Sequence, residues 1–195
     1  KMYLAVRESI NDTTYTQITS FLEEHYYTSS SGVIYCQTVK QCHDVYNNLR
    51  INYNCEVYNA KVDDKIRSER HQAWQDNRIK ILIATVGSFA MGIDKIDARF
   101  VVLVGMQLSM ELFMQCIGRA GRDGKICHAL LLYREKDWFT NIRIVNQSCK
   151  TLPVDKFDSS DIDRIITYAL NATNSCWKSS LAKHFGEKME ADCNG

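Results

Sequence analysis

Short apolar runs alternate along the chain with segments whose apolar residues recur every three or four positions. The run 33–36 is typical of a buried strand, and residues 39–49 present their apolar side chains on one helical face. The same pattern predicts strands near 1–10, 56–58, 79–84, 99–104 and 129–133, and a loop at 29–32. It predicts a helix that starts at 11–13 and reaches 26, and helices over 110–117 and 135–145. A further helix is predicted to start at 63–64, with Ile66, Ala73 and Trp74 on its apolar face.

Strands that alternate with helices predict an α/β fold with a mainly parallel sheet covered by helices on both faces. The nearly continuous apolar strands agree with this, because such strands are buried on both sides. Residues 147–160 are polar and contain Pro153, the one proline of the chain. We therefore place a boundary there and expect two units, 1–146 and 147–195, with a new helix around 162–169 in the second.

Composition narrows the class of protein. The 195 residues are 45% hydrophobic and 24% charged, as in a globular protein. No apolar run reaches the ~18 residues of a membrane span and no leader opens the chain, so we expect an intracellular protein whose eight cysteines are mostly reduced. The net charge of +1 excludes strong global attraction to nucleic acid, so binding to phosphate backbones would need locally placed cations.

The most specific chemical signal lies at residues 115–124. Arg119 and Arg122 are three apart and share one side of a helical turn, while Gly118, Ala120 and Gly121 allow another surface to approach closely. Guanidinium groups held in this way suit a phosphate that gathers negative charge during transfer. A glycine-rich turn with two solvated arginines is the alternative, and it would be favoured if the arginine pair stood alone.

Residues 118–124, preceded by Gln115, resemble the last helicase motif of the RecQ family of DNA helicases. Further segments are similar to other parts of that family's second motor domain, in the same order: 1–7, 32–36, 84–86, 89–95 and 99–102. The resemblance implies that 1–146 is the second RecA-like motor domain of an ATP-dependent 3′–5′ DNA helicase. It implies that Gln115, Arg119 and Arg122 act on ATP, with Arg122 as the arginine finger.

The resemblance also implies contacts for other residues. Thr85 would contact the DNA backbone at the carboxyl edge of the sheet, and Thr38 would cap the next helix, touch DNA, or both, with capping preferred. Asp94 and Gly92 would lie near the nucleotide. A capping threonine at 85 and an ordinary turn aspartate at 94 are the alternatives that the residues alone favour.

The chain departs from the family pattern at four places. Asn59 stands where histidine is usual, Lys61 where glycine is usual and Ile96 where proline is usual. One extra residue falls around Gly87–Ser88. Asn59 can hydrogen-bond but cannot titrate near neutral pH.

The last residues resemble the start of the RecQ zinc-binding segment, in which a cysteine opens a helix that ends near 185–187. Cys176 and Cys193 match two zinc ligands of that segment, whereas a structural zinc normally needs four. His184 is a conceivable third ligand, although its place beside Phe185 favours packing. The cysteines are either zinc ligands of an incomplete site or unrelated thiols, and the flanking match favours the first.

No phosphate cradle of the form Gly-x-x-x-x-Gly-Lys-Ser/Thr and no magnesium-binding Asp-Glu run is present in the sequence. The resemblance implies that a preceding RecA-like domain of the same polypeptide supplies these elements and holds ATP and Mg²⁺. The expected partners are single-stranded DNA and duplex junctions, not a membrane, in the nucleus if the source is eukaryotic. This fragment should be inactive alone. An RNA helicase domain and a non-catalytic nucleic-acid or protein-binding module stay open as alternatives.

Overall fold

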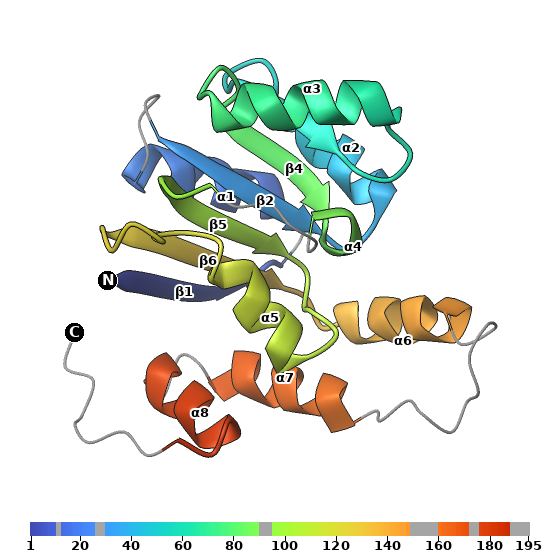
Figure 1. Cartoon of the computed structure of the whole chain (residues 1–195). Helices are drawn as coiled ribbons and strands as arrows, with labels where there is room; N and C mark the ends of the chain where they lie inside the picture. The colour runs from blue at the N-terminus through green and yellow to red at the C-terminus, as the bar shows by residue number, and fades with distance from the viewer. Residues whose placement is uncertain (11–12, 26–29, 90–94, 149–159, 172–175, 188–195) are drawn as a thin grey trace.

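The computed structural model describes residues 1–10, 13–25, 30–89, 95–148, 160–171 and 176–187. Their centre is a six-stranded sheet with the order β1-β6-β5-β2-β4-β3, in which every neighbouring pair is parallel (Figure 1). The strands are β1 (Met2–Glu8), β2 (Ser31–Cys36), β3 (Cys55–Tyr58), β4 (Ile81–Thr85), β5 (Ala98–Val104) and β6 (Cys127–Tyr133).

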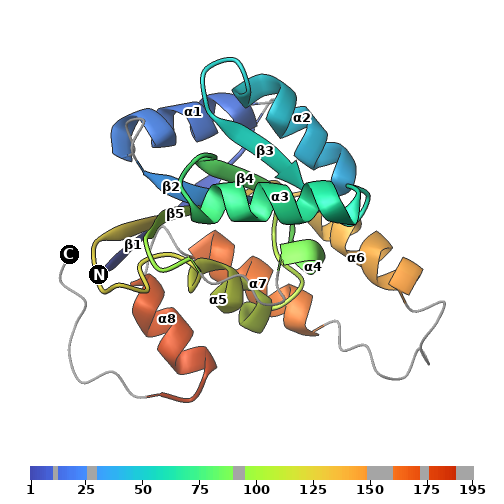
Figure 2. The same ribbon diagram turned by 45° about the horizontal axis from the view of Figure 1, so that its top comes forward.

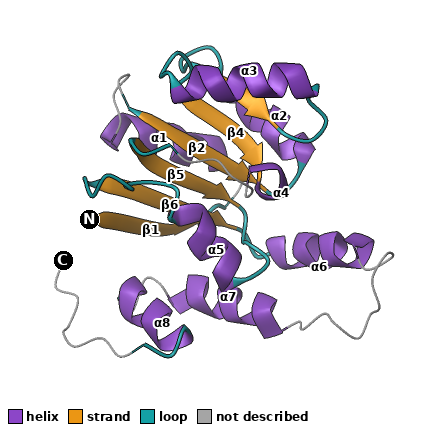
Figure 3. Ribbon diagram, in the orientation of Figure 1, coloured by secondary structure: helices purple, strands orange, loops and turns teal. Residues whose placement is uncertain are grey.

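The helices of the described segments lie around this sheet and beyond its β1 edge (Figure 3). They are α1 (Thr14–His25), α2 (Val39–Leu49), α3 (Asp64–Gln75), α4 (Val86–Phe89), α5 (Met110–Ile117), α6 (Asp137–Ser148), α7 (Ser160–Asn171) and α8 (Trp177–His184). None of these helices is both long and apolar enough to cross a membrane.

Side chains alternate across each strand and build a core on each face of the sheet. On β2, Ile34 and Cys36 pack with α1 and α2, whereas Val33 and Tyr35 pack with the face covered by α3, α5, α7 and α8. Figure 2 shows these two groups of helices on opposite sides of the strands. The predicted α/β fold, with a parallel sheet covered on both faces, is confirmed.

The loop predicted at 29–32 is wrong at its end, because Ser31 and Gly32 already belong to β2. Ser31 is buried, and a Cβ at Gly32 would lie only 2.5 Å from the ring of Phe100. Position 32 is a glycine because the aromatic ring of Phe100, on the neighbouring strand, occupies the space that a side chain would need. The strand start was predicted as a loop because serine and glycine are typical of turns.

The predicted core face of α3 is also partly wrong. Ile66 is 44% exposed, whereas Ala73 and Trp74 are buried as predicted. The Trp74 Nε1–H donates to the carbonyl of Gly32 at 3.2 Å. The last turns of α3 therefore make its core contact, and its first turn, capped by Asp63, stays at the surface.

Several element ends differ from the predicted ones by two or three residues. The strand predicted at 129–133 begins at Cys127, where β6 pairs with Met2 of β1. The strand predicted at 79–84 is β4, which begins at Ile81 and ends at Thr85, and the short helix α4 follows it directly. The helix predicted over 135–145 is α6, which begins at Asp137 and ends at Ser148. Pairing with a distant strand decided the first of these ends, and such pairing leaves no local signal.

The C-terminal helices contribute to the same core as the sheet. Ile165, Tyr168 and Ala169 of α7 and Leu181 of α8 are buried in the cluster that contains Phe113. Helix α6 continues two residues past the predicted boundary at 146, and residues 149–159 lie outside the described part of the chain. The division into units 1–146 and 147–195 stays a prediction.

Candidate nucleotide and nucleic-acid contact sites

Helix α5 positions the first of the candidate catalytic residues. The Ser109 hydroxyl caps its start by accepting from the backbone N–H of Leu112 at 3.2 Å. Phe113, Cys116 and Ile117 recur at helical spacing and are buried, so the opposite face is turned to solvent. Gln115 lies on that face and is exposed.

The turn after α5 is held to the sheet by its backbone and by one ion pair. The N–H of Gly121 donates to the carbonyl of Ala98 at 2.9 Å, and Gly121 has a φ of +70°. The Asp123 carboxylate accepts from Arg99 at 2.6 Å, and this bond holds the pKa of Asp123 below its usual range. The turn is therefore a rigid platform, and Asp123 is part of its structure.

Arg119 is half-buried and Arg122 is exposed on this platform. The Nε–H of Arg122 donates back to the carbonyl of Gly118 at 3.3 Å. Burial and the neighbouring Cys116 raise the pKa of Tyr35, whereas the charges of Arg119 and Arg122 act in the opposite direction. The charges of both guanidinium groups therefore act on the side chain of Tyr35, near the carboxyl end of β2.

Thr85 and Thr38 lie at the carboxyl edge of two neighbouring strands. Thr85 ends β4 and is paired in register with Cys36, the last residue of β2. Thr38 follows β2 and caps α2, its hydroxyl accepting from the N–H of Gln41 at 3.1 Å. The preferred capping role of Thr38 is confirmed, and its contact with DNA stays a prediction.

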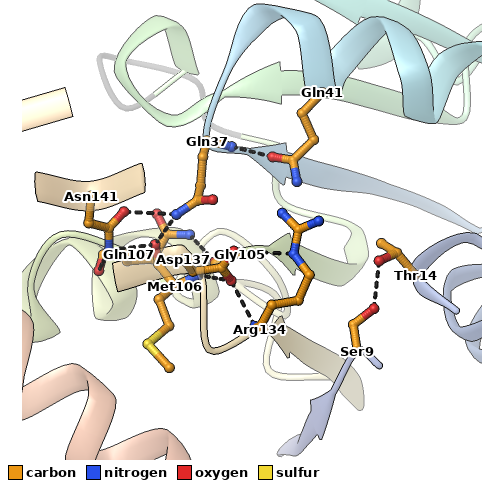
Figure 4. Close-up of polar contacts among 10 residues, drawn as sticks. All are labelled: Ser9, Thr14, Gln37, Gln41, Gly105, Met106, Gln107, Arg134, Asp137 and Asn141. Carbon is orange, nitrogen blue, oxygen red and sulfur yellow. Dashed lines mark hydrogen bonds and ion pairs between the residues drawn. The ribbon is translucent and has the colours of Figure 1, made fainter. Parts of the chain in front are cut away.

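A cavity of about 240 Å³ opens beside Thr85 and is also lined by Gln37 and Asn141. The Gln37 amide nitrogen donates to Asn141 Oδ1 at 2.8 Å and to the carbonyl of Met106 at 2.9 Å. Asn141 in turn donates to the carbonyls of Met106 and Gln107 (Figure 4). This network joins the segment after β2 to α6. It could not be predicted from local sequence patterns, because its members lie about 30 to 100 residues apart.

Asp137 forms the other half of this polar cluster. Its side chain is fully buried and accepts from the backbone N–H groups of Met106 and Arg134, at 3.3 and 2.9 Å. It also accepts from Arg134 Nε at 3.2 Å (Figure 4). A buried carboxylate is tolerated here because three donors satisfy it.

Asp94 and Gly92, the predicted nucleotide contacts, lie outside the described residues. The segment that follows them is anchored by Lys95, which is 3% exposed. Its ammonium donates to the carbonyl of Gln75 and pairs with Asp97, both at 3.0 Å, and lies 5.5 Å from the centre of the Trp74 ring. The roles of Asp94 and Gly92 stay predictions.

Asn59, at the position where the family usually has histidine, is fully buried. Its side-chain oxygen accepts from the N–H of Lys61 at 2.9 Å and closes a tight turn. Asn59 therefore does hydrogen-bond, as its chemistry allows, and it serves the turn after β3.

The zinc ligands stay a prediction. Cys176 is the N-terminal cap residue of α8 and is half-buried, whereas Cys193 lies outside the described residues. His184 lies 3.4 Å from a Glu111 carboxylate oxygen and edge-on to Phe185, which agrees with packing. Within the described segments no group of three or more His, Cys, Asp or Glu side chains could hold a metal ion.

Comparisons with known proteins agree with these motifs. Residues 14–124 match the family described as helicase conserved C-terminal domain. The chain is 31% identical to the ATP-dependent DNA helicase Q-like 2 of Arabidopsis thaliana, covering 100% of this chain and 26% of that protein. It is 33% identical to the RecQ-like DNA helicase blm-1 of Caenorhabditis elegans, covering 83% and 16%. The chain thus spans about a quarter or less of these relatives.

Solved structures share the fold. The Escherichia coli DEAD-box protein SrmB, bound to regulator of ribonuclease activity A, superposes with a TM-score of 0.60 at 21% identity, covering 70% of this chain and 78% of that one. Domain 2 of the Mss116p DEAD-box helicase, bound to an RNA duplex, gives 0.58 at 16% identity, covering 96% and 80%. The fold is RecA-like. The chain belongs to the helicase conserved C-terminal domain family, and its similarity to RecQ-like DNA helicases over most of its length confirms the resemblance carried by its motifs.

Proposed function

We propose that this chain is the second motor domain of an ATP-dependent 3′–5′ DNA helicase of the RecQ type. The observation that carries the proposal is the exposed Arg122 on a turn held rigidly by Gly121 and by the Arg99–Asp123 pair. A positive charge on a fixed platform can stabilise developing negative charge without reorganising during the reaction. The DNA helicase relatives favour DNA over RNA as the polymer.

ATP would lie between this domain and a preceding RecA-like domain of the same polypeptide. That domain would supply the phosphate cradle and hold Mg²⁺, because this sequence contains neither motif. Arg122 reaches the phosphate that is transferred, Arg119 adds a second positive charge, and Gln115 orients groups at the same phosphate. Asp94 and Gly92 complete the nucleotide contacts. This domain alone is then unable to hydrolyse ATP.

DNA would run along the carboxyl edge of the sheet, where Thr85 and Thr38 contact the phosphate backbone. Backbone contacts carry no base information, so unwinding tolerates any sequence. Single-stranded DNA and duplex junctions are the proposed substrates. Because its proposed substrate is DNA, the protein would be intracellular, and it would be in the nucleus if the source is eukaryotic. Cys176 and Cys193 would contribute to a zinc site whose further ligands lie elsewhere in the polypeptide.

The test is the ATPase activity of the complete polypeptide that contains this chain, with single-stranded DNA or RNA added. We expect stimulation by DNA, and a loss of about a thousandfold or more in Arg122→Ala, the range known for arginine fingers. Lys125→Ala is the matched control, because Lys125 is an exposed cation in the same turn. It should keep nearly the full rate.

Other outcomes have equally definite meanings. Stimulation by RNA alone would assign the domain to an RNA helicase. An equal loss in Arg122→Ala and Lys125→Ala would remove the specific role of Arg122. A folded complete polypeptide that neither nucleic acid stimulates would contradict the motor assignment and favour a binding module.

A further inference from the structure

A second cavity, of about 250 Å³, opens at the carboxyl edge on the other side of Gln37. We call it the Arg134 pocket. Its lining includes Thr14, Thr38, Lys40, Gln41, Arg134 and Thr140. They come from the starts of α1 and α2 and from the β6–α6 segment. The pocket thus combines two cations with three hydroxyl groups at the edge where Thr38 lies.

Arg134 is held in place by the buried Asp137. Asp137 accepts from both the Nε and the backbone N–H of Arg134, which fixes the side chain at its base and along its length. Figure 4 shows the two terminal guanidinium nitrogens pointing away from Asp137 and toward Gln41. The contacts among described residues give neither terminal nitrogen an acceptor. A guanidinium fixed in this way offers its free fork to a ligand.

Each cation of the pocket is paired with a carboxylate on one side only. Arg134 and Lys40 are its lining cations, and Asp44, which pairs with Lys40 at 2.6 Å, is its lining anion. Asp137 lies behind the guanidinium, is fully buried and is already saturated by three donors. The space in front of Arg134 therefore faces N–H and O–H donors, including the terminal nitrogens of the guanidinium group, and such donors suit a phosphate group.

We propose that the Arg134 pocket binds a backbone phosphate of the nucleic-acid strand, with Arg134 as its anchor. This inference rests on the proposed function. Gln37 lines both this pocket and the cavity beside Thr85, and Thr38 lines this pocket, so a strand held at Thr85 and Thr38 would border the pocket. A free phosphate has the same chemistry, but Thr38 in the wall of the pocket favours the strand.

The experiment measures the affinity of the complete polypeptide for a single-stranded DNA oligonucleotide over a series of salt concentrations. We expect Arg134→Gln to bind about tenfold more weakly. The slope of log affinity against log salt should fall in magnitude by about 0.7, the value for one lost phosphate contact on a single strand. Arg143→Gln is the matched control, because Arg143 is exposed on helix α6, which follows Arg134, lies outside the pocket and should change neither quantity.

Arg134→Gln leaves Asp137 with one donor fewer and could therefore destabilise the fold. A second variant tests the pocket without this disturbance. Lys40→Gln removes the other cation of the pocket without touching Asp137, since the Lys40 side chain is 85% exposed. It should weaken binding in the same direction by a smaller factor. Unchanged affinity and slope in both variants would overturn the inference.

Measurements of ATPase activity and of inorganic phosphate binding separate this inference from the proposed function. If Arg134→Gln binds like the unmodified protein while DNA-stimulated ATPase still depends on Arg122, the pocket assignment is wrong and the motor assignment stands. If inorganic phosphate alone binds the protein at millimolar concentration, and Arg134→Gln abolishes that binding without weakening DNA binding, the ligand is a free phosphate. If DNA neither binds nor stimulates ATPase, both proposals fail.

Discussion

Gly121 is constrained both by its backbone conformation and by its surroundings. Its φ of +70° lies in the left-handed region, and a Cβ there would overlap the sulfur of Cys127. Gly124 closes the same turn with a φ of +77°, but no atom lies within 4 Å of the place where its Cβ would be. The two positions therefore share a backbone cost and differ in the space around them.

This difference gives a prediction at the scale of the residue. Gly121→Ala should lower the free energy of unfolding by roughly 2–4 kcal/mol, since strain in the left-handed region adds to overpacking. Gly124→Ala should cost only about 1 kcal/mol, the left-handed strain alone. Urea unfolding of both variants measures the two costs. Equal costs would mean that Cys127 moves aside freely and that the turn is less rigid than its contacts indicate.

At the scale of the element, α6 acts as a clamp on the loop between β5 and α5. Its residues Asp137 and Asn141 are buried and satisfy the backbone of Met106 and Gln107. Asn141 also accepts from the amide of Gln37, the residue directly after β2. The clamp thus holds the segment that carries Thr38 against the loop between β5 and α5.

Removal of one side chain tests the clamp. Asn141→Ala removes one of the two acceptors of the Gln37 amide and leaves the buried Gln107 carbonyl without its donor, so it should cost roughly 1–3 kcal/mol of unfolding free energy. Arg143→Ala, on the exposed side of the same helix, should stay within about 0.5 kcal/mol. Urea unfolding monitored by tryptophan fluorescence compares the two. A cost below about 1 kcal/mol for Asn141→Ala would show that water replaces the lost partners and that the clamp is not structural.

At the scale of the whole molecule, α7 and α8 share a core with the sheet. Ile165 is completely buried, and Tyr168 lies beside Phe113 of α5 with 5.4 Å between ring centres. A common core implies that these helices and the sheet unfold together. This bears on the predicted division at 146 and 147, because two independent units would unfold separately.

Ile165→Ala tests that cooperativity. We expect a loss of roughly 2–4 kcal/mol in a single unfolding transition that circular dichroism and tryptophan fluorescence report alike. Leu170→Ala, on the same helix but 55% exposed, should cost much less. If instead Ile165→Ala splits the transition so that only part of the helical signal melts early, α7 and α8 form a unit of their own.

Local patterns in the sequence predicted much of the fold and part of the site. Periods of two and of three to four residues follow from the geometry of strands and helices, so the α/β order and most core faces could be predicted from contiguous residues. The motif around Arg119 and Arg122 was equally visible, because its members lie within one helix and one turn. The capping role of Thr38 followed from its position at a helix start.

Contacts between distant segments were decided by the tertiary structure alone. Arg99 meets Asp123, Gln37 meets Asn141, and Gly32 makes room for Phe100 only after the strands have paired. The residue types did not predict these partners, because arginine and amide side chains are equally stable when they are exposed to solvent. The amino-acid sequence alone thus determined the order of the helices and strands and the family to which the chain belongs. The rigid turn under Arg122 and the fixed guanidinium of Arg134 exist only because burial brings donors and acceptors from separate elements together.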